Sequence, residues 1–492
     1  MLRRTLLLLL LTATLSAAAQ WPLSPRRETP EREVRAVWLT TLMGLDWPRT
    51  TDMAAQQAAL TAMLDDLQAA GINTVLFQTR VRGTTAYPSA IEPWDGAFTG
   101  KAGCAPDYDV LRFAIDACHQ RGMEFHAWVV CYPVCKVTVA KALGKESIVR
   151  RHPEMVQRCG DQWMLDPGVP GVADYLASLC REIVTLYDVD GLHLDYIRYP
   201  EHGIAFDDAK TYRRYGQGVP KAQWRRDNVS RTVEAIAQQV RAVRPWVKIS
   251  CSPVGKYADL PRQSSRGWNA RDAVAQDAML WLQRGWMDML MPMMYFDGDH
   301  FYPFLVDWME RAAEVAGGRL IVPGLGIYLL SPREKDWPLT AITRQLHTLR
   351  GLGAGGAAYF RTRFLTDNQK GLLSFLRHDY YLRPALPPAM TWLDDTPPAQ
   401  PRYTVTRQGD TPSLPPLLRG ATTLHFAWEN IVEPTPITYN IYRLDGKERV
   451  LIAHHLQGTS YDYTPPLPSL LDAKYEVVAM DAYGNESRSG TL

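Results

Sequence analysis

Residues 190–196, DGLHLDY, are the stretch of the chain that decides the fold. Apolar and polar side chains alternate in it, so that Leu192 and Leu194 lie on one face and His193 and Asp195 on the other. This alternation predicts a strand whose leucines pack under helices, while His193 and Asp195 point into the interior of a closed sheet. Amphipathic helical patterns precede and follow the stretch, so we expect the strand to belong to a series of βα units.

The same arrangement continues in both directions along the chain. We expect eight strands, at Arg35–Thr40, Thr74–Thr79, Glu124–Val130, Gly191–Tyr196, Lys248–Ser252, Met289–Tyr295, Leu320–Gly324 and Gly356–Arg361. Helical patterns between them include Ala54–Ala70, Tyr108–Arg121, Val172–Tyr187, Trp224–Val243, Asp272–Arg284, Pro303–Ala316 and Thr340–Arg350. Four glycines stand where helices should end, as C-terminal caps do: Gly71, Gly122, Gly285 and Gly351.

Eight βα units predict an α/β protein with a (β/α)8 barrel. A doubly wound open sheet is the alternative, and a glycine-rich turn after the first strand would favour it. Residues 40–48, TTLMGLDWP, do not form such a turn. The barrel is therefore the favoured prediction.

Size and composition agree with a folded protein of two unequal parts. The chain has 492 residues, of which 46% are hydrophobic and 22% charged, as in a globular protein. The formal charge of +2 falls to zero once Arg3 and Arg4 are removed with the leader expected below. A neutral chain has no electrostatic footprint for nucleic acid. We expect a monomer that binds no nucleic acid.

The N-terminal segment predicts export from the cytoplasm. Residues 1–20 read MLRRTLLLLLLTATLSAAAQ, with two arginines, an apolar run and three small residues, Ala17 to Ala19. This is the pattern of a secretory signal peptide over residues 1–19, cleaved after Ala19. We expect a periplasmic or secreted protein without a membrane span. The seven cysteines lack zinc-site spacing, so we expect mostly buried free thiols and no cofactor or bound metal.

A change in sequence composition near residue 384 predicts a second domain. Prolines mark a stiff linker over residues 384–402, which separates a barrel domain at 30–383 from a small β-sandwich at 403–492. Strand patterns in this sandwich lie at Thr423–Trp428, Ile437–Leu444 and Lys474–Met480. ITYNIYRLDG (437–446) and KYEVVAMDAYGNESRSG (474–490) resemble a fibronectin type III module. Its role is open between a spacer, a glycan or partner contact, and a stabilising appendage.

The active site of a (β/α)8 barrel lies at the C-terminal ends of its strands. Asp195 ends its strand and faces inward, which makes it the leading candidate for a catalytic carboxylate; the alternative is an ion pair with an inward arginine such as Arg80 or Arg361. The same alternation places further polar and aromatic side chains at this rim: Gln78, Arg80, Arg82, His126, Trp128, His193, Tyr295, Tyr359 and Arg361. Aromatic rings that stack on sugars, beside amides and charges that bind hydroxyls, favour a carbohydrate ligand.

Motifs of other chemistries are missing from the sequence. It has no Gly-x-Ser-x-Gly elbow, no His-Glu-x-x-His and no P-loop. A metal site built from His126, His193 and Asp195 stays an alternative to a carbohydrate site.

Seven separated segments of the predicted barrel share a pattern with known proteins. They are RAVWLTTLMGLDWP (35–48), INTVLFQTRVRGTTAYPS (72–89), GMEFHAWVVCYP (122–133), WMLDPGVPGVADYL (163–176), YDVDGLHLDYIRYP (187–200), ISCSPVG (249–255) and GWMDMLMPMMYF (285–296). In this order they resemble the glycoside-hydrolase-family-10-like barrel proteins. The resemblance implies a secreted bacterial barrel that hydrolyses O-glycosyl bonds, in a group that includes enzymes acting on peptide-free peptidoglycan strands. Members often have two consecutive acids after the fourth strand, and here Tyr196 replaces the second.

Glycoside hydrolysis usually needs two carboxyl groups, an acid and a base or nucleophile. We expect Asp195 to be the nucleophile or base. For its partner we favour Asp297, after the sixth strand, then Glu201, which follows the fourth, and then Glu92.

Two arginines at the rim indicate the kind of glycan. We assign Arg80, Arg82 and His126 to substrate binding, because a guanidinium binds a carboxylate such as the lactyl group of N-acetylmuramic acid. Two other functions remain open, a non-catalytic glycan-binding protein and a metal-dependent polysaccharide deacetylase or hydrolase.

Overall fold

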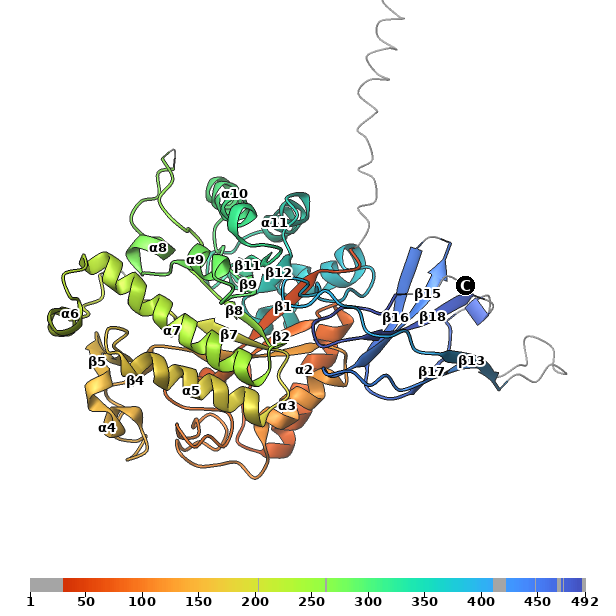
Figure 1. The fold of residues 1–492 in the computed structure, drawn as a ribbon, viewed down its shortest axis with the longest axis horizontal. Coiled ribbons are helices and arrows are strands. Elements are labelled where there is room, and N and C mark those ends of the chain that lie inside the picture. Colours follow the sequence, from red (N-terminus) through yellow and green to blue (C-terminus); the bar gives the residue numbers. More distant parts are fainter. Residues whose placement is uncertain are drawn as a thin grey trace, which may run out of the picture.

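A computed structural model describes residues 30–488, apart from residues 202, 262, 410–421, 447, 467–469 and 472. The predicted signal peptide, residues 1–19, lies outside this range. The described chain forms a (β/α)8 barrel followed by an all-β region of antiparallel sheets, as predicted (Figure 1).

The barrel strands are parallel, and each pairs with its neighbour around the ring. They are β1 (Val34–Leu39), β2 (Thr74–Arg80), β3 (Glu124–Val130), β7 (Gly191–Asp195), β8 (Lys248–Cys251), β9 (Met289–Leu290), β10 (Leu320–Ile321) with β11 (Gly324–Leu325), and β12 (Gly356–Tyr359). The short strands β10 and β11 together occupy the position of the seventh barrel strand. The first of them pairs with β9 and the second with β12, and this closes the ring.

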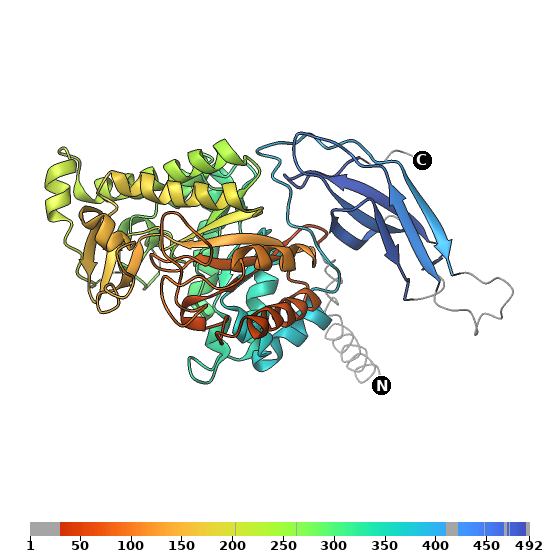
Figure 2. The same ribbon diagram turned by 90° about the horizontal axis from the view of Figure 1, so that it is seen from below.

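Helices cover the outside of the ring (Figures 1 and 2). The principal ones are α2 (Met53–Ala69), α3 (Val110–His119), α5 (Gly171–Leu186), α7 (Lys221–Val243), α9 (Ala278–Gln283), α10 (Gly298–Val315), α11 (Leu339–Gly351), α12 (Thr362–Thr366) and α13 (Leu372–Phe375). Side-chain caps explain where some begin: the carboxylate of Asp52 accepts from the Ala55 amide at 2.8 Å at the start of α2.

Some predicted boundaries are wrong. The predicted helix Asp272–Arg284 is two helices, α8 (Ala270–Ala273) and α9, because the backbone at Ala275 turns to a φ of +65° between them. The predicted strand Met289–Tyr295 ends at Leu290. Gly351 lies inside α11, and Gly353 adopts the positive φ that ends this helix.

Short elements that the sequence did not reveal lie in the loops of the barrel. A small antiparallel sheet follows β3 and has the order β4 (Pro133–Lys136), β6 (Gln162–Leu165), β5 (Val156–Cys159). The helices α4 (Ile148–Arg151) and α6 (Ala209–Tyr215) complete this side of the molecule. All seven cysteines are free thiols, and five are buried.

Two apolar layers follow from the alternation along each strand. On β7, Leu192 and Leu194 belong to the large core between the strands and the helices. A smaller core fills the barrel, and Trp38 and Trp128 are its largest members. His193 and Asp195 are buried on the inward face of the same strand, as the sequence predicted.

The all-β region contains two three-stranded antiparallel sheets around a core of its own. One has the order β13 (Tyr403–Gln408), β14 (Thr423–Trp428), β17 (Ser460–Tyr463), and the other β16 (Glu448–Leu456), β15 (Thr438–Asp445), β18 (Lys474–Met480). This region lies beside the N-terminal ends of the barrel strands (Figure 2). None of the helices in the described ranges is long and apolar enough to cross a membrane.

Candidate active site

A cleft of about 250 Å³ opens at the C-terminal ends of the barrel strands. A third of the described residues that line it are aromatic: Trp38, Trp128, Tyr196, Tyr295 and Phe360. Asp195 lies in this cleft, at the last position of β7. The geometry of the cleft therefore agrees with a site that holds a ring-shaped, partly apolar ligand against a carboxylate.

Three hydrogen bonds fix the Asp195 carboxylate. Its Oδ1 accepts from the Tyr196 amide at 2.7 Å and from the Ser252 hydroxyl at 2.9 Å, and its Oδ2 accepts from the Trp128 indole at 3.1 Å. The donors come from β3, from the residue that follows β8 and from the turn after β7, so the orientation of the carboxylate depends on the barrel itself.

Burial raises the pKa of Asp195 above its ordinary value, although the hydrogen bonds and the charge of Arg198 act in the opposite direction. A raised pKa widens the pH range over which this side chain keeps its proton. The sequence-based prediction gave Asp195 the role of nucleophile or base, and this role stays a prediction. Burial acts in favour of a proton donor, whereas the three hydrogen bonds favour the ionised form that a base or nucleophile needs.

Six of the predicted site residues line the cleft together: Gln78, Arg82, Trp128, Asp195, Tyr295 and Arg361. Gln78 uses its carbonyl oxygen to accept from Thr40 and from the amides of Thr41 and Leu42. Its amide nitrogen donates no hydrogen bond within the part of the chain that the structure describes, so it is available to a ligand.

Arg82 and Arg361 differ in their freedom to bind a ligand. Arg361 is paired with the buried carboxylate of Asp46. Arg82 is half-buried and makes no ion pair or hydrogen bond with any described residue, so it presents an unneutralised charge to the cleft.

Arg80 is not in the cleft, which corrects its assignment to substrate binding. It is fully buried and pairs with Glu92 at 2.6 Å, and it also donates to the Cys131 carbonyl at 2.7 Å. The cause is an irregularity in β2, where Gln78 is opposite Trp128 but Arg80 is opposite Val129. The extra residue turns Arg80 away from the face of Gln78. The same pair removes Glu92 from the candidate acids.

Two predicted ligands, His126 and His193, face inward as expected but lie beneath the cleft. His193 is buried; its Nε2 accepts from the Trp38 indole at 3.0 Å, and its Nδ1 lies 2.9 Å from the Ser250 hydroxyl. His126 is also buried and contacts Glu124 at 3.1 Å. Among the described residues no group of three potential metal ligands forms, so the alternative site of His126, His193 and Asp195 is not assembled.

Tyr359 points outward, which corrects its predicted place at the rim. It belongs to the core under the helices, and its hydroxyl lies 2.7 Å from that of Tyr381. Since β12 ends at Tyr359, the strand alternation does not extend to Arg361.

The two predicted partner acids also lie outside the cleft lining. Asp297 is exposed and stands at the N-cap of α10. Glu201 is half exposed and pairs with Arg198 at 3.1 Å. Neither lines the cleft that holds Asp195, and their catalytic role stays a prediction.

Sequence reasoning missed several residues of the cleft. Trp38 has the inward parity of β1 and could have been found from it. Ser252 follows β8 in the segment ISCSPVG with the same parity as Ser250. Tyr196 and Phe360 come after the ends of their strands, where the alternation gives no direction.

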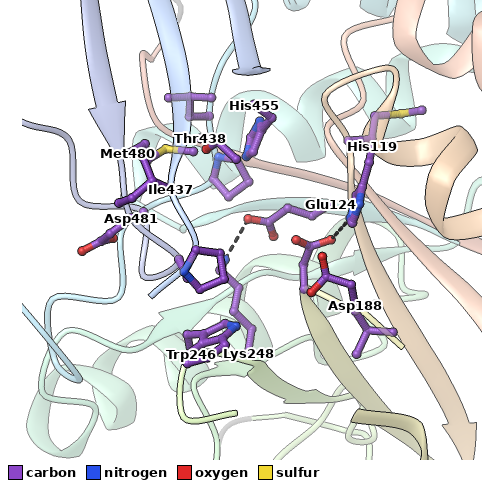
Figure 3. A pocket seen from close by; sticks show the side chains of 18 of the residues that line it. His119, Glu124, Asp188, Trp246, Lys248, Ile437, Thr438, His455, Met480 and Asp481 are labelled. Atoms are coloured by element: carbon purple, nitrogen blue, oxygen red, sulfur yellow. Dashed lines mark hydrogen bonds and ion pairs between the residues drawn. The ribbon is translucent and has the colours of Figure 1, made fainter. Parts of the chain in front are cut away.

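A larger cavity, of about 370 Å³, lies at the opposite end of the barrel, where it meets the all-β region (Figure 3). Its barrel side has two ion pairs, Glu124 with Lys248 at 2.7 Å and Asp190 with His119 at 2.8 Å. Because these groups are already neutralised by each other, and because the N-terminal strand ends support stability in this fold, we do not assign the chemistry to this cavity.

A (β/α)8 barrel with a buried carboxylate among aromatic rings at its C-terminal mouth has the form of a carbohydrate-active site. Comparison with known sequences agrees: the family described as glycosyl hydrolase-like 10 matches residues 33–317. The chain belongs to this family.

The chain is similar to the glycosyl hydrolase YngK of Bacillus subtilis (strain 168), with 31% identity over 490 residues that cover 93% of this chain and 92% of that protein. It is similar to the glycosyl hydrolase DigH of Escherichia coli (strain K12), with 32% identity over 371 residues that cover 68% and 84%. Among solved structures, alpha-L-fucosidase isoenzyme 2 from Paenibacillus thiaminolyticus aligns with a TM-score of 0.48 and 14% identity, over 71% of this chain and 49% of that one.

Proposed function

We propose that the protein is an exported enzyme that hydrolyses O-glycosidic bonds of a bacterial or environmental polysaccharide, with Asp195 as its proton donor. The observation that carries the proposal is the position of this carboxyl group, which is buried at the end of β7, held by three hydrogen bonds and surrounded by aromatic rings. In this site the protonated acid gives its proton to the leaving oxygen, while the rings hold the sugar and exclude water.

The charge in the cleft supports an anionic glycan, of which peptide-free peptidoglycan strands are the leading candidate. Arg82 has no protein partner among the described residues and lines the cleft. A bound carboxylate, such as the lactyl group of a muramic acid residue, would neutralise it.

The substitution Asp195→Asn tests the enzymatic role. Asparagine keeps the size and most hydrogen bonds of the side chain but has no acidic proton. We expect the turnover of peptide-free strands, followed by mass analysis of the products, to fall by about 10²–10⁴-fold while strand binding is retained. Full turnover by the variant would refute the proposal, and an unmodified protein that binds strands without cleaving them would establish the non-catalytic alternative.

The substitution Arg82→Gln tests the substrate class. A hydrogen bond to a charged group contributes about 1.5–3 kcal/mol, so kcat/KM on an anionic glycan should fall by roughly 10- to 150-fold, with little change on a neutral one. Arg363→Gln is the matched control, because Arg363 forms an exposed pair with Asp367 outside the cleft. Equal losses of kcat/KM on both glycans would show that Arg82 does not recognise the negative charge of the substrate.

A further inference from the structure

Tyr196 has an unusual backbone conformation at the mouth of the barrel. Its φ is +49°, in the left-handed region that bulky side chains rarely adopt. In this conformation its amide donates to the Asp195 Oδ1 at 2.7 Å, and its ring lines the cleft. A single residue therefore both holds the candidate catalytic carboxylate and forms part of the wall around it.

The guanidinium of Arg198 lies against this residue from outside the cleft. It stacks on the Tyr196 ring, 4.7 Å from the ring centroid, and it lies 5.6 Å from the centroid of the Trp268 ring. Its side chain is only 4% exposed and does not line the cleft. Any effect of Arg198 on a bound ligand must therefore pass through the residues that it contacts.

Ion pairing does not account for the burial of Arg198. Its carboxylate partner among the described residues is Glu201, which is half exposed and lies 3.1 Å away. The Nε atom of Arg198 is buried and has no hydrogen-bond partner in the described part of the chain. Because an incompletely paired cation is costly to bury, the contacts with the two aromatic rings must contribute to holding it in place.

Both rings belong to segments that hold Asp195. Tyr196 is in the turn after β7, whereas Trp268 is in the segment between β8 and α8. The second segment also contains Ser252, whose hydroxyl donates to the Asp195 Oδ1 at 2.9 Å. Arg198 thus joins the two segments that supply donors to the same carboxylate oxygen.

We infer that Arg198 is a positioning residue of the proposed reaction: its stack between Tyr196 and Trp268 keeps Tyr196 in the left-handed conformation, and the Tyr196 amide in turn fixes the Asp195 carboxylate. This inference rests on the proposed glycosidase function and adds to it a residue outside the cleft. The positive charge of Arg198 acts in the same direction as the amide, because it stabilises the ionised carboxylate and lowers the pKa of Asp195.

The substitution Arg198→Met tests the positioning role. Methionine keeps a long side chain against both rings but has neither the charge nor the planar guanidinium. We expect kcat on peptide-free strands to fall by about tenfold with KM little changed, because the carboxylate loses its fixed orientation while the cleft lining stays the same. Arg198→Lys keeps the charge and should restore part of the loss. Unchanged kcat in Arg198→Met would overturn the inference.

An NMR titration of the Asp195 carboxyl carbon separates positioning from a purely structural role. The signal is assigned with the Asp195→Asn variant, and the titration needs no substrate. We expect Arg198→Met to raise the pKa of Asp195 by about one unit, since the ionised form loses a nearby charge and a well-oriented amide. An unchanged pKa, whatever happens to stability, would overturn the inference. A raised pKa in a protein that cleaves no glycan would refute the proposed function alone.

Arg225→Met is the matched control. Arg225 also stacks on a tyrosine, Tyr199, at 4.8 Å from the ring centroid, and it pairs with Asp208 outside the cleft lining. We expect this variant to lose stability without a change in kcat or in the pKa of Asp195. Equal changes in the Arg198→Met and Arg225→Met variants would show a general effect on the fold and would overturn the inference.

The substitution Tyr196→Gly tests the route through Tyr196. Glycine adopts a positive φ readily, so the amide at this position no longer needs the stack on Arg198. Adding Arg198→Met to Tyr196→Gly should therefore lower kcat by less than about threefold, against about tenfold in the natural sequence. An equal loss in both backgrounds would show that Arg198 does not act through Tyr196.

Discussion

The hydrogen bond from Ser252 to Asp195 offers a direct test of the proton role of this carboxyl group. The bond is 2.9 Å long and buried, and it stabilises the ionised form. A hydrogen bond to a charged group contributes about 1.5–3 kcal/mol, and one to the neutral acid about 1 kcal/mol. With a difference of about 1.4 kcal/mol, the substitution Ser252→Ala should raise the pKa of Asp195 by about one unit.

The assay is the pH dependence of kcat/KM on a soluble oligosaccharide. An acid catalyst acts in its protonated form, so activity is present below its pKa and is lost as the pH rises through it. The alkaline limb should therefore move up by about one unit in the Ser252→Ala variant. Ser250→Ala is the matched control, because Ser250 lies two residues earlier and contacts His193 instead. If the acid limb moves up instead, Asp195 acts as a base or nucleophile; if neither limb moves, it does not control the profile.

Two predictions concern stability. Arg80→Met leaves Glu92 buried without its ion-pair partner, so the free energy of unfolding measured in urea should fall by about 3–5 kcal/mol. Adding Glu92→Gln to this variant should restore part of the loss. A fall below about 1 kcal/mol in the Arg80→Met variant would contradict the prediction. Asp190 raises the pKa of His119 to about 9, against about 6.5 in the unfolded chain, so the pair stabilises fully below pH 6.5 and its contribution is lost as the pH rises through 9. The difference in unfolding free energy between wild type and His119→Gln should shrink over this interval, and a difference independent of pH would refute the linkage.

The sequence predicted the fold well because each barrel strand carries one strong signal, the alternation of faces. On β7 this signal placed Asp195 and His193 on the inward face, and on β3 it did so for Trp128. Alternation gives the face but not the height along the barrel axis, and for this reason His193 lies beneath the cleft rather than in it.

The remaining errors arise where the regular strand geometry stops. The irregularity in β2 reverses the face of Arg80, and nothing in the sequence TVLFQTR marks it. The end of β12 at Tyr359 similarly breaks the relation to Arg361. A second acid could not be identified from the sequence, since Asp297 and Glu201 follow strands as catalytic acids do and only the folded loops show that they turn away.

The contact between the start of the barrel and the all-β region has a practical meaning for anyone who shortens this protein. Arg32 binds the carbonyls of Pro387 and Gly484, both at 3.0 Å, and also pairs with Glu486, while the Glu33 amide donates to the Leu386 carbonyl at 2.9 Å. In a barrel that ends at the linker, the Arg32 guanidinium and the Glu33 amide would lose these acceptors directly before β1. These contacts join the start of the first barrel strand to the linker and to the all-β region, so the intact polypeptide is the right material for assays and crystals.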